Sequence, residues 1–121
     1  MNADFDFVRN FLFAVEQKAT DPVTPLSRET LGFTRMPVGM YVRQVALFDR
    51  AGLLESIRQD TSEGSYLTPT RLTEAGVQFL DKIRDEKVWQ RILEINNAEA
   101  ATFSMSVLMA LAERINELEK K

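Results

Sequence analysis

The sequence contains neither cysteine nor histidine, and these two absences exclude several kinds of site. Without cysteine the chain has no disulfide, no thiolate metal ligand and no cysteine nucleophile. Without histidine it has no Ser-His-Asp triad and none of the zinc sites that cysteine and histidine form. Its five glycines are scattered, and neither a Walker motif nor a nucleophile elbow is present. We therefore expect no enzyme and no cofactor.

Long hydrophobic runs are missing as well. No apolar stretch approaches the roughly 20 residues that span a bilayer, and the first six residues lack the basic start and apolar core of a secretory leader. We expect a cytoplasmic protein without a membrane partner. Of the 121 residues, 45% are hydrophobic and 27% are charged, which is typical of one globular domain.

Hydrophobic periodicity predicts two helices in the first half of the chain. The first spans residues 4–18, with an apolar stripe at steps of three and four: Phe5, Val8, Leu12 and Val15. The second spans residues 37–50; Pro37 suits its first turn, and Gly52 suits its C-terminal cap. Between them, residues 26–36 favour a short strand or an irregular segment.

A β-hairpin and a capped helix are predicted next. Residues 54–59 alternate in polarity, residues 60–65 are turn formers, and residues 66–72 form the return strand. Thr73 is a good N-cap for a helix that reaches about Arg84, and its apolar stripe is expected to be Val77, Leu80 and Ile83. A helix, a hairpin and a capped helix follow one another in the order of a winged helix.

Residues 85–121 are expected to form a helical extension of that winged-helix core. Residues 85–87 either break the preceding helix or continue it, and the apolar pattern then runs to Asn96. A last helix, residues 104–119, carries a short a/d-type seam of Leu108, Leu111, Ile115 and Leu118. This seam packs on its own domain, the commoner use of so short a stripe, or joins two copies in a homodimer. The predicted fold is thus mostly α with a small β-hairpin, a winged helix-turn-helix domain with an added C-terminal helix.

The most specific motif lies in the strand-to-helix segment. Arg71-Leu-Thr-Glu-Ala-Gly76 is followed by Phe79-Leu-Asp81 and Ile83-Arg-Asp85. With Ala51-Gly-Leu-Leu54 upstream and Trp89 downstream, it resembles a family of short, uncharacterised proteins carried largely by phages, prophages and their bacterial hosts, filed as a domain of unknown function. The resemblance covers almost the whole chain. It implies a winged-helix fold and a mobile-element context, and it implies no activity.

The arginines of the middle segment point to double-stranded DNA as a partner. The net charge of −3 gives no global attraction for nucleic acid, so binding requires a local basic face. Residues 28–58 hold five arginines against three acids. In a winged helix the helix before the hairpin enters the major groove. The predicted contacts to base edges or phosphates are Arg43, Gln44 and Arg50, and those to the DNA backbone are Arg35 and Arg58.

A second interpretation stays open, because Asp60 and Glu63 at the predicted hairpin tip repel phosphate. The chain then is a protein-interaction module that binds and modulates a host complex through the acidic wing or the surface around Met40. A plainer role for the arginines themselves is that they are solvated, or paired with neighbours such as Asp49 and Glu55.

Overall fold

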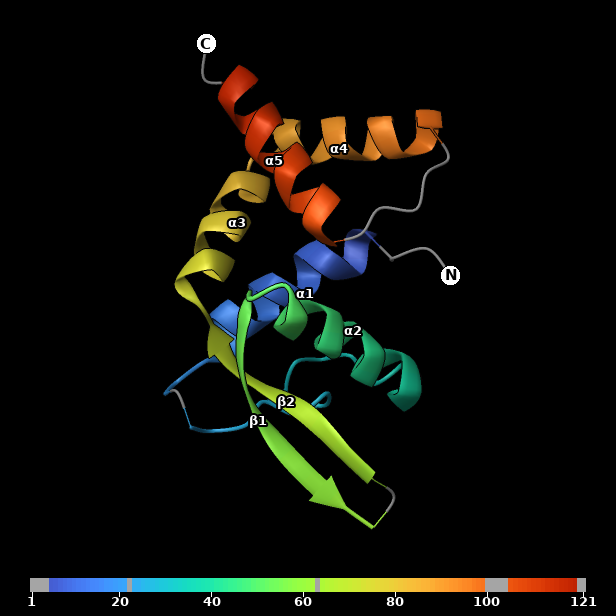
Figure 1. Ribbon diagram of the computed structural model, residues 1–121, viewed down its shortest axis with the longest axis vertical. Coiled ribbons are helices and arrows are strands. Elements are labelled where there is room, and N and C mark those ends of the chain that lie inside the picture. The colour runs from blue at the N-terminus through green and yellow to red at the C-terminus, as the bar shows by residue number, and fades with distance from the viewer. Residues whose placement is uncertain (1–4, 22, 63, 100–104, 120–121) are drawn as a thin grey trace.

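The chain folds into helices at both ends of a two-stranded hairpin. The computed structural model describes residues 5–21, 23–62, 64–99 and 105–119. These residues form five helices and two antiparallel strands: α1 (Phe5–Lys18), α2 (Val38–Arg50), β1 (Leu54–Thr61), β2 (Gly64–Leu72), α3 (Glu74–Arg84), α4 (Glu86–Glu99) and α5 (Met105–Glu119). Figure 1 shows α4 and α5 at one end, α1 and α2 across the middle, and the hairpin at the other end. This order is consistent with a winged-helix layout.

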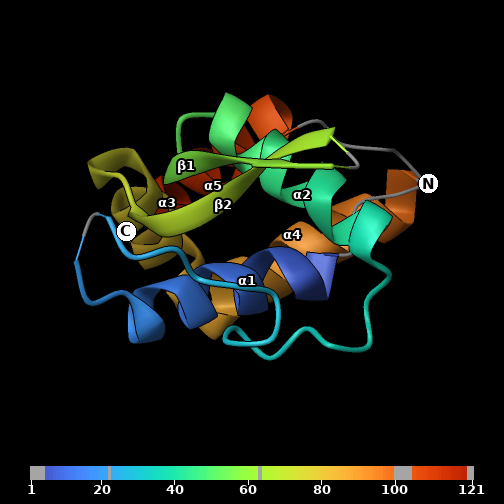
Figure 2. The same cartoon turned by 90° about the horizontal axis from the view of Figure 1, so that it is seen from below.

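Aromatic side chains of α1 and α2 form the centre of the core. Phe11 is fully buried, and its ring stacks on those of Phe48 and Phe7, with centroids 4.9 Å and 5.2 Å away. Such aromatic pairs stabilise a core beyond the burial of their surface. α1 packs against β2 and α3, and Figure 2 shows it running across the molecule below the hairpin. The wide apolar face of α1 therefore packs against both the hairpin and α3.

The segment before α2 is a series of turns. The Leu26 amide donates to the Pro69 carbonyl of β2 at 2.8 Å, as a third strand would. The chain then curls away, because Ser27 accepts from the amides of Thr30 and Leu31 at 3.0 Å each. Of the two alternatives for residues 26–36, the irregular segment is the observed one, and the short strand does not form.

The hairpin is longer and its turn tighter than predicted. β1 continues to Thr61 and β2 begins at Gly64, so most of the expected turn at residues 60–65 is paired strand. Gly64 has a φ of 133°, a value that side chains disfavour, and its carbonyl accepts from the Thr61 hydroxyl at 2.8 Å. Glu63, predicted at the tip, lies outside the described residues.

The predicted N-cap role of Thr73 is confirmed. The same residue also links the start of α3 to the end of α2. Its hydroxyl accepts from the Gly76 amide at 3.0 Å and donates to the Gly52 carbonyl at 2.6 Å. Gly52 has a φ of 80°, which fits the predicted cap after α2. The predicted stripe of α3 is wrong in one place: Val77 is 39% exposed, whereas Gly76 is buried against Leu53.

Replacing Thr73 with alanine is expected to lower the free energy of unfolding by about 1–2 kcal/mol, the cost of a lost N-cap. Thr73→Ser keeps the hydroxyl and is the matched control, with most of the stability retained. Urea denaturation followed by circular dichroism measures both variants. Equal stability of the alanine variant and the wild type would contradict the capping role.

The extension begins with a break at Asp85. This residue is extended, and its carboxylate accepts from the Lys87 amide at 2.8 Å, so it ends α3 and caps α4. The alternative of one continuous helix is therefore not the observed one. α4 continues to Glu99, so the predicted end at Asn96 is wrong.

The C-terminal seam packs largely within the chain. α5 lies against α3 and α4, Ile115 is buried and Leu111 is half-buried. Leu118 is 57% exposed, and the side chain of Leu108 lies outside the described part. Ile115 is thus part of the core of its own chain, and a homodimer through the seam stays a prediction.

Candidate nucleic-acid interface

α2 presents two arginines on its outward face. Tyr41, Val45 and Phe48 are buried toward the core, and Arg43 and Arg50 are exposed. Arg43 and Arg50 are two helical turns apart, which places them on one face of the helix. Within the described residues neither side chain has an ion pair or hydrogen bond. Both guanidinium groups are therefore free to meet an external partner.

Gln44 does not share that face. It follows Arg43 by one residue, which turns it by about 100° around the helix axis, and it is half-buried, as is Met40. The side next to the arginines holds Leu47, which is 41% exposed. The predicted contact of Gln44 with a base edge stays a prediction, made from a half-buried position beside the arginine face.

The two predicted backbone contacts differ from each other. Arg35 is exposed in the turns before α2 and has no ion pair among the described residues. Arg58, on β1, pairs with Asp60 at 3.3 Å and donates to the Ser65 hydroxyl at 3.2 Å. The Ser65 hydroxyl donates in turn to Asp60. Arg58 is thus partly neutralised by its own strand pair.

Arg28 holds the turns in place rather than facing outward. Its Nη1 atom donates to the carbonyls of Phe33, Thr34 and Met36 at 3.1, 2.7 and 2.9 Å. Its Nη2 atom lies 3.1 Å from the Glu29 carboxylate. Of the five arginines counted in residues 28–58, Arg28 is therefore not available to an external partner. This role depends on how the turns fold, so no local pattern in the sequence signals it.

Further arginines connect helices that are distant in the sequence. Arg9 of α1 pairs with Glu86 of α4 at 2.9 Å, donates to the Arg84 carbonyl and lies over the Trp89 ring. Arg84 pairs with Glu16 and Asp81. On the hairpin, Arg71 pairs with Glu55. Among the described residues, free arginines thus occur before and on α2, where Arg35, Arg43 and Arg50 lie, and on α4 and α5, where Arg91 and Arg114 lie.

These pairs predict acid sensitivity. Hydrogen bonds from Gln90 and Arg9 hold the pKa of Glu86 below its ordinary value of 4.5, and the hydrogen bond from Arg71 lowers the pKa of Glu55 from the same value. A carboxylate with a lowered folded-state pKa stabilises the fold above the unfolded value, and this stability is lost as the pH falls through the folded value. We expect the free energy of unfolding to decrease below about pH 4.5.

Urea titrations at several pH values measure this decrease. A double variant, Glu55→Gln with Glu86→Gln, should show a shallower decrease than the wild type. If the double variant loses stability at low pH as steeply as the wild type, other carboxylates cause the decrease.

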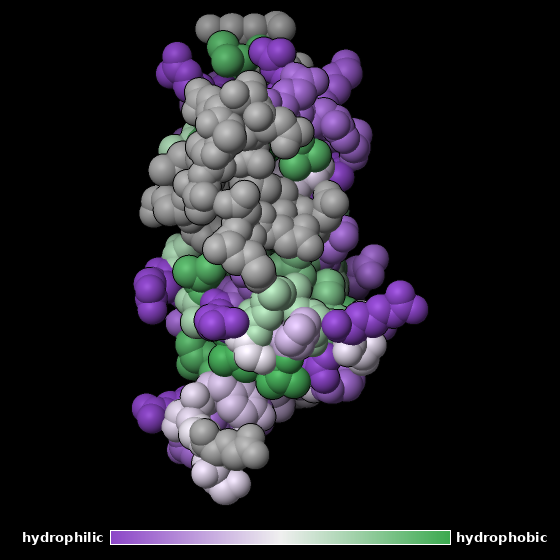
Figure 3. All heavy atoms as spheres, turned by 90° about the vertical axis from the view of Figure 1, so that its right-hand side faces the viewer, coloured by the Kyte–Doolittle hydropathy of each residue, from purple (hydrophilic) through white to green (hydrophobic). Residues whose placement is uncertain are grey.

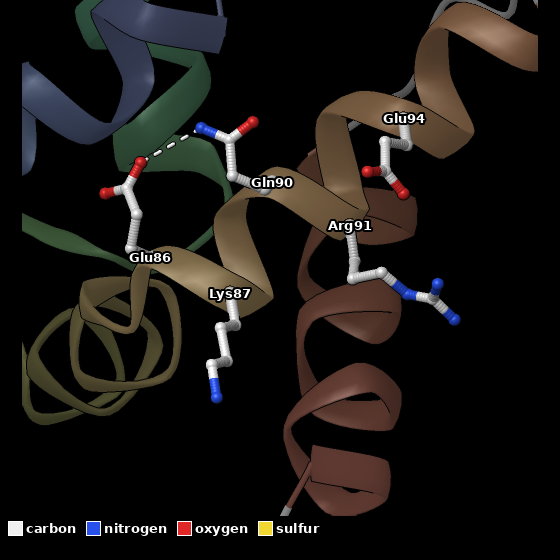
Figure 4. Close-up of a pocket in the computed structure, with 5 residues that line it drawn as sticks. All are labelled: Glu86, Lys87, Gln90, Arg91 and Glu94. Carbon is white, nitrogen blue, oxygen red and sulfur yellow. Dashed lines mark hydrogen bonds between the residues drawn. The ribbon is translucent and has the colours of Figure 1, made fainter.

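A further surface feature lies on α4. A shallow depression on α4 is lined by charged and amide side chains, where Gln90 donates to Glu86 at 2.9 Å and Lys87 and Arg91 point away from that pair (Figure 4). Such an arrangement is typical of a solvated helix face. No group of acidic side chains in the described ranges has the geometry of a metal site. No helix in those ranges is long and apolar enough to cross a membrane.

Comparison with known proteins identifies the family. The chain is 25% identical over 115 residues to an "Uncharacterized protein" of Haemophilus influenzae, with 95% of each chain covered. No solved structure matches. The family model described as hypothetical protein DUF2513 matches residues 2–102. The predicted resemblance to a domain of unknown function is confirmed. The chain belongs to the DUF2513 family of hypothetical proteins.

Proposed function

We propose that the protein is a winged-helix regulator or accessory factor of a phage or prophage that binds double-stranded DNA through α2. The observation that carries this proposal is the pair of exposed, unpaired arginines on the outward face of that helix, Arg43 and Arg50. Residues 30–48 contain no carboxylate, in a chain whose net charge is −3. Phosphate contacts supply most of non-specific affinity, so this acid-free stretch is where DNA meets least repulsion.

Arg35 adds a third unpaired charge at the start of the same region. The hairpin contributes less to the proposed interface, because Arg58 is paired with Asp60. The proposed contact is therefore centred on the helix, with Arg43 and Arg50 at base edges or phosphates and Arg35 at the backbone.

Binding to a labelled duplex at several salt concentrations tests the proposal. Three arginine–phosphate contacts predict that log K falls with log salt with a slope of about −2.7. Fluorescence anisotropy from about 50 to 200 mM salt, the range over which this dependence is large, measures the slope. Absence of binding at the lowest salt, with protein up to roughly 100 μM, would reject DNA as the partner, since non-specific complexes form in that range.

A host protein is the second candidate, and Leu47 favours it. This leucine is 41% exposed on α2 beside Arg43 and Arg50, and Val38 at the start of the helix is 59% exposed. Figure 3, which faces the end where α2 begins, shows apolar side chains gathered between the hairpin and the grey atoms. Exposed apolar residues rimmed by charge suit an acidic, partly apolar protein surface. Retention of a host protein from nuclease-treated lysate, lost in Leu47→Asp, would favour this candidate over DNA.

A further inference from the structure

An apolar side chain lies between the two exposed arginines of α2. Leu47 follows Arg43 by about one helical turn and precedes Arg50 by nearly another, and it is 41% exposed. At about 100° per residue, these three side chains leave the helix within about 60° of one another. Arg43, Leu47 and Arg50 therefore form one row along the outward face of the helix.

The other residues near this row allow close approach of a partner. Gly39, one turn before Arg43, is exposed and has no side chain, and Ala46 beside Leu47 is small and half-buried. Residues 38–50 contain one acid, Asp49. It is half-buried and is turned by about 120° from Arg43 around the helix axis. The acid of this helix therefore does not share the row.

The charges on either side of Leu47 select the kind of partner. A single exposed leucine needs no explanation by itself. Here it is flanked by two guanidinium groups that are unpaired within the described residues, so the complementary surface is apolar in the middle and negative on both sides. The major groove of duplex DNA has this chemistry, because phosphates line its edges and thymine presents a C5-methyl group on its floor.

The spacing along α2 also matches the spacing of bases. A rise of about 1.5 Å per residue places Leu47 about 6 Å from Arg43 and about 4.5 Å from Arg50 along the helix axis. Successive base pairs are about 3.4 Å apart, so each separation corresponds to between one and two base pairs. A helix in the groove can thus bring Leu47 to one base while both arginines reach neighbouring positions.

We propose that Leu47 is a specificity-determining residue that contacts the C5-methyl group of a thymine in the major groove. This inference rests on the proposed function, because it requires α2 to enter that groove. Phosphates are the same in every sequence and carry no sequence information directly, whereas the thymine methyl group distinguishes one base from the other three. Leu47 would then give sequence preference to an interface whose affinity comes largely from arginine.

Duplexes that differ only in this methyl group test the inference. They are first selected from a random-sequence pool by the wild-type protein and are then prepared with thymine or with uracil throughout. Uracil pairs with adenine as thymine does but lacks the methyl group. We expect the wild type to bind the uracil duplexes about fourfold more weakly for each methyl group contacted, which corresponds to burial of one methyl-sized group. Fluorescence anisotropy at one fixed salt concentration measures both affinities.

Leu47→Ala should bind the thymine and uracil duplexes equally, because the contacting side chain is gone. Comparing two proteins on two duplexes separates this contact from any effect of the methyl group on duplex shape. Val77→Ala is the matched control: it removes an apolar side chain that is 39% exposed on α3, and it should keep the full preference for thymine. Leu47→Met keeps an apolar side chain of similar length and should keep part of the preference.

The inference is overturned if the wild type binds both duplexes equally, or if Leu47→Ala still prefers thymine. In both cases salt-dependent binding would leave the proposed function standing. A wild type that binds no duplex rejects the function and the inference together. If Leu47→Ala leaves both DNA affinities unchanged but no longer retains a host protein, Leu47 belongs to a protein contact and the inference fails.

Discussion

Replacement of Gly76 with alanine is expected to lower the free energy of unfolding by about 2 kcal/mol or more. An added Cβ atom would overlap the backbone carbonyl oxygen of Leu53 and lie 3.3 Å from the Leu72 Cβ. A backbone atom yields less than a flexible side chain, so the cost lies at the upper end of overpacking, about 3 kcal/mol. The better helix propensity of alanine offsets about 1 kcal/mol of this cost. α3 would have to move away from Leu53, whose carbonyl accepts from the Thr73 amide at 3.0 Å.

Gly39→Ala is the matched control for this prediction. Gly39 is also helical, has no heavy atom within 4 Å of an added Cβ, and has an ordinary negative φ. It should gain about 0.5–1 kcal/mol from helix propensity. Thermal and urea denaturation measure both variants. A Gly76→Ala variant as stable as Gly39→Ala would show that α3 is not held closely against Leu53.

Reversal of charge at both Arg43 and Arg50 is expected to weaken duplex DNA binding by at least about 30-fold. Loss of two arginine contacts at about 1 kcal/mol or more each gives this minimum. The salt slope should also become shallower by about one for each lost phosphate contact. Both residues are exposed and unpaired within the described chain, so the melting temperature should change little.

Arg91→Glu with Arg114→Glu is the control for charge alone. These arginines are likewise exposed and unpaired in the described residues, but they lie on α4 and α5, and the change in net charge is the same. If the two double variants lose affinity equally, the effect is one of total charge and α2 is not the interface. If the α2 variant unfolds instead, its arginines are structural.

Local signals predicted the elements around the proposed interface well. The helix from Val38 to Arg50, the cap at Gly52 and the N-cap at Thr73 all depend on residues within a few positions of one another. The hairpin was also predicted, although its tip was placed too broadly. Pairing in the sheet extended both strands through residues that resemble turn formers, such as Asp60 and Ser65.

The site was less predictable because exposure and pairing depend on tertiary contacts. Periodicity places Gln44 about 100° from Arg43 around α2, but only the packed structure shows that it is half-buried. Val77 matched a helical stripe, yet it is 39% exposed, because Gly76, one residue earlier, is the position that meets Leu53.

By itself, the sequence determined the order of helices and strands, the absence of cysteine and histidine chemistry, and the acid-free stretch that contains α2. Periodicity, caps and turn formers depend on residues within a few positions of one another, so they can be recognised from the sequence alone. Tertiary structure alone decided which arginines remain free. Arg9 meets Glu86 across 77 positions and Arg28 meets the carbonyls of a folded turn, because opposite charges pair by distance in space and not by distance along the chain.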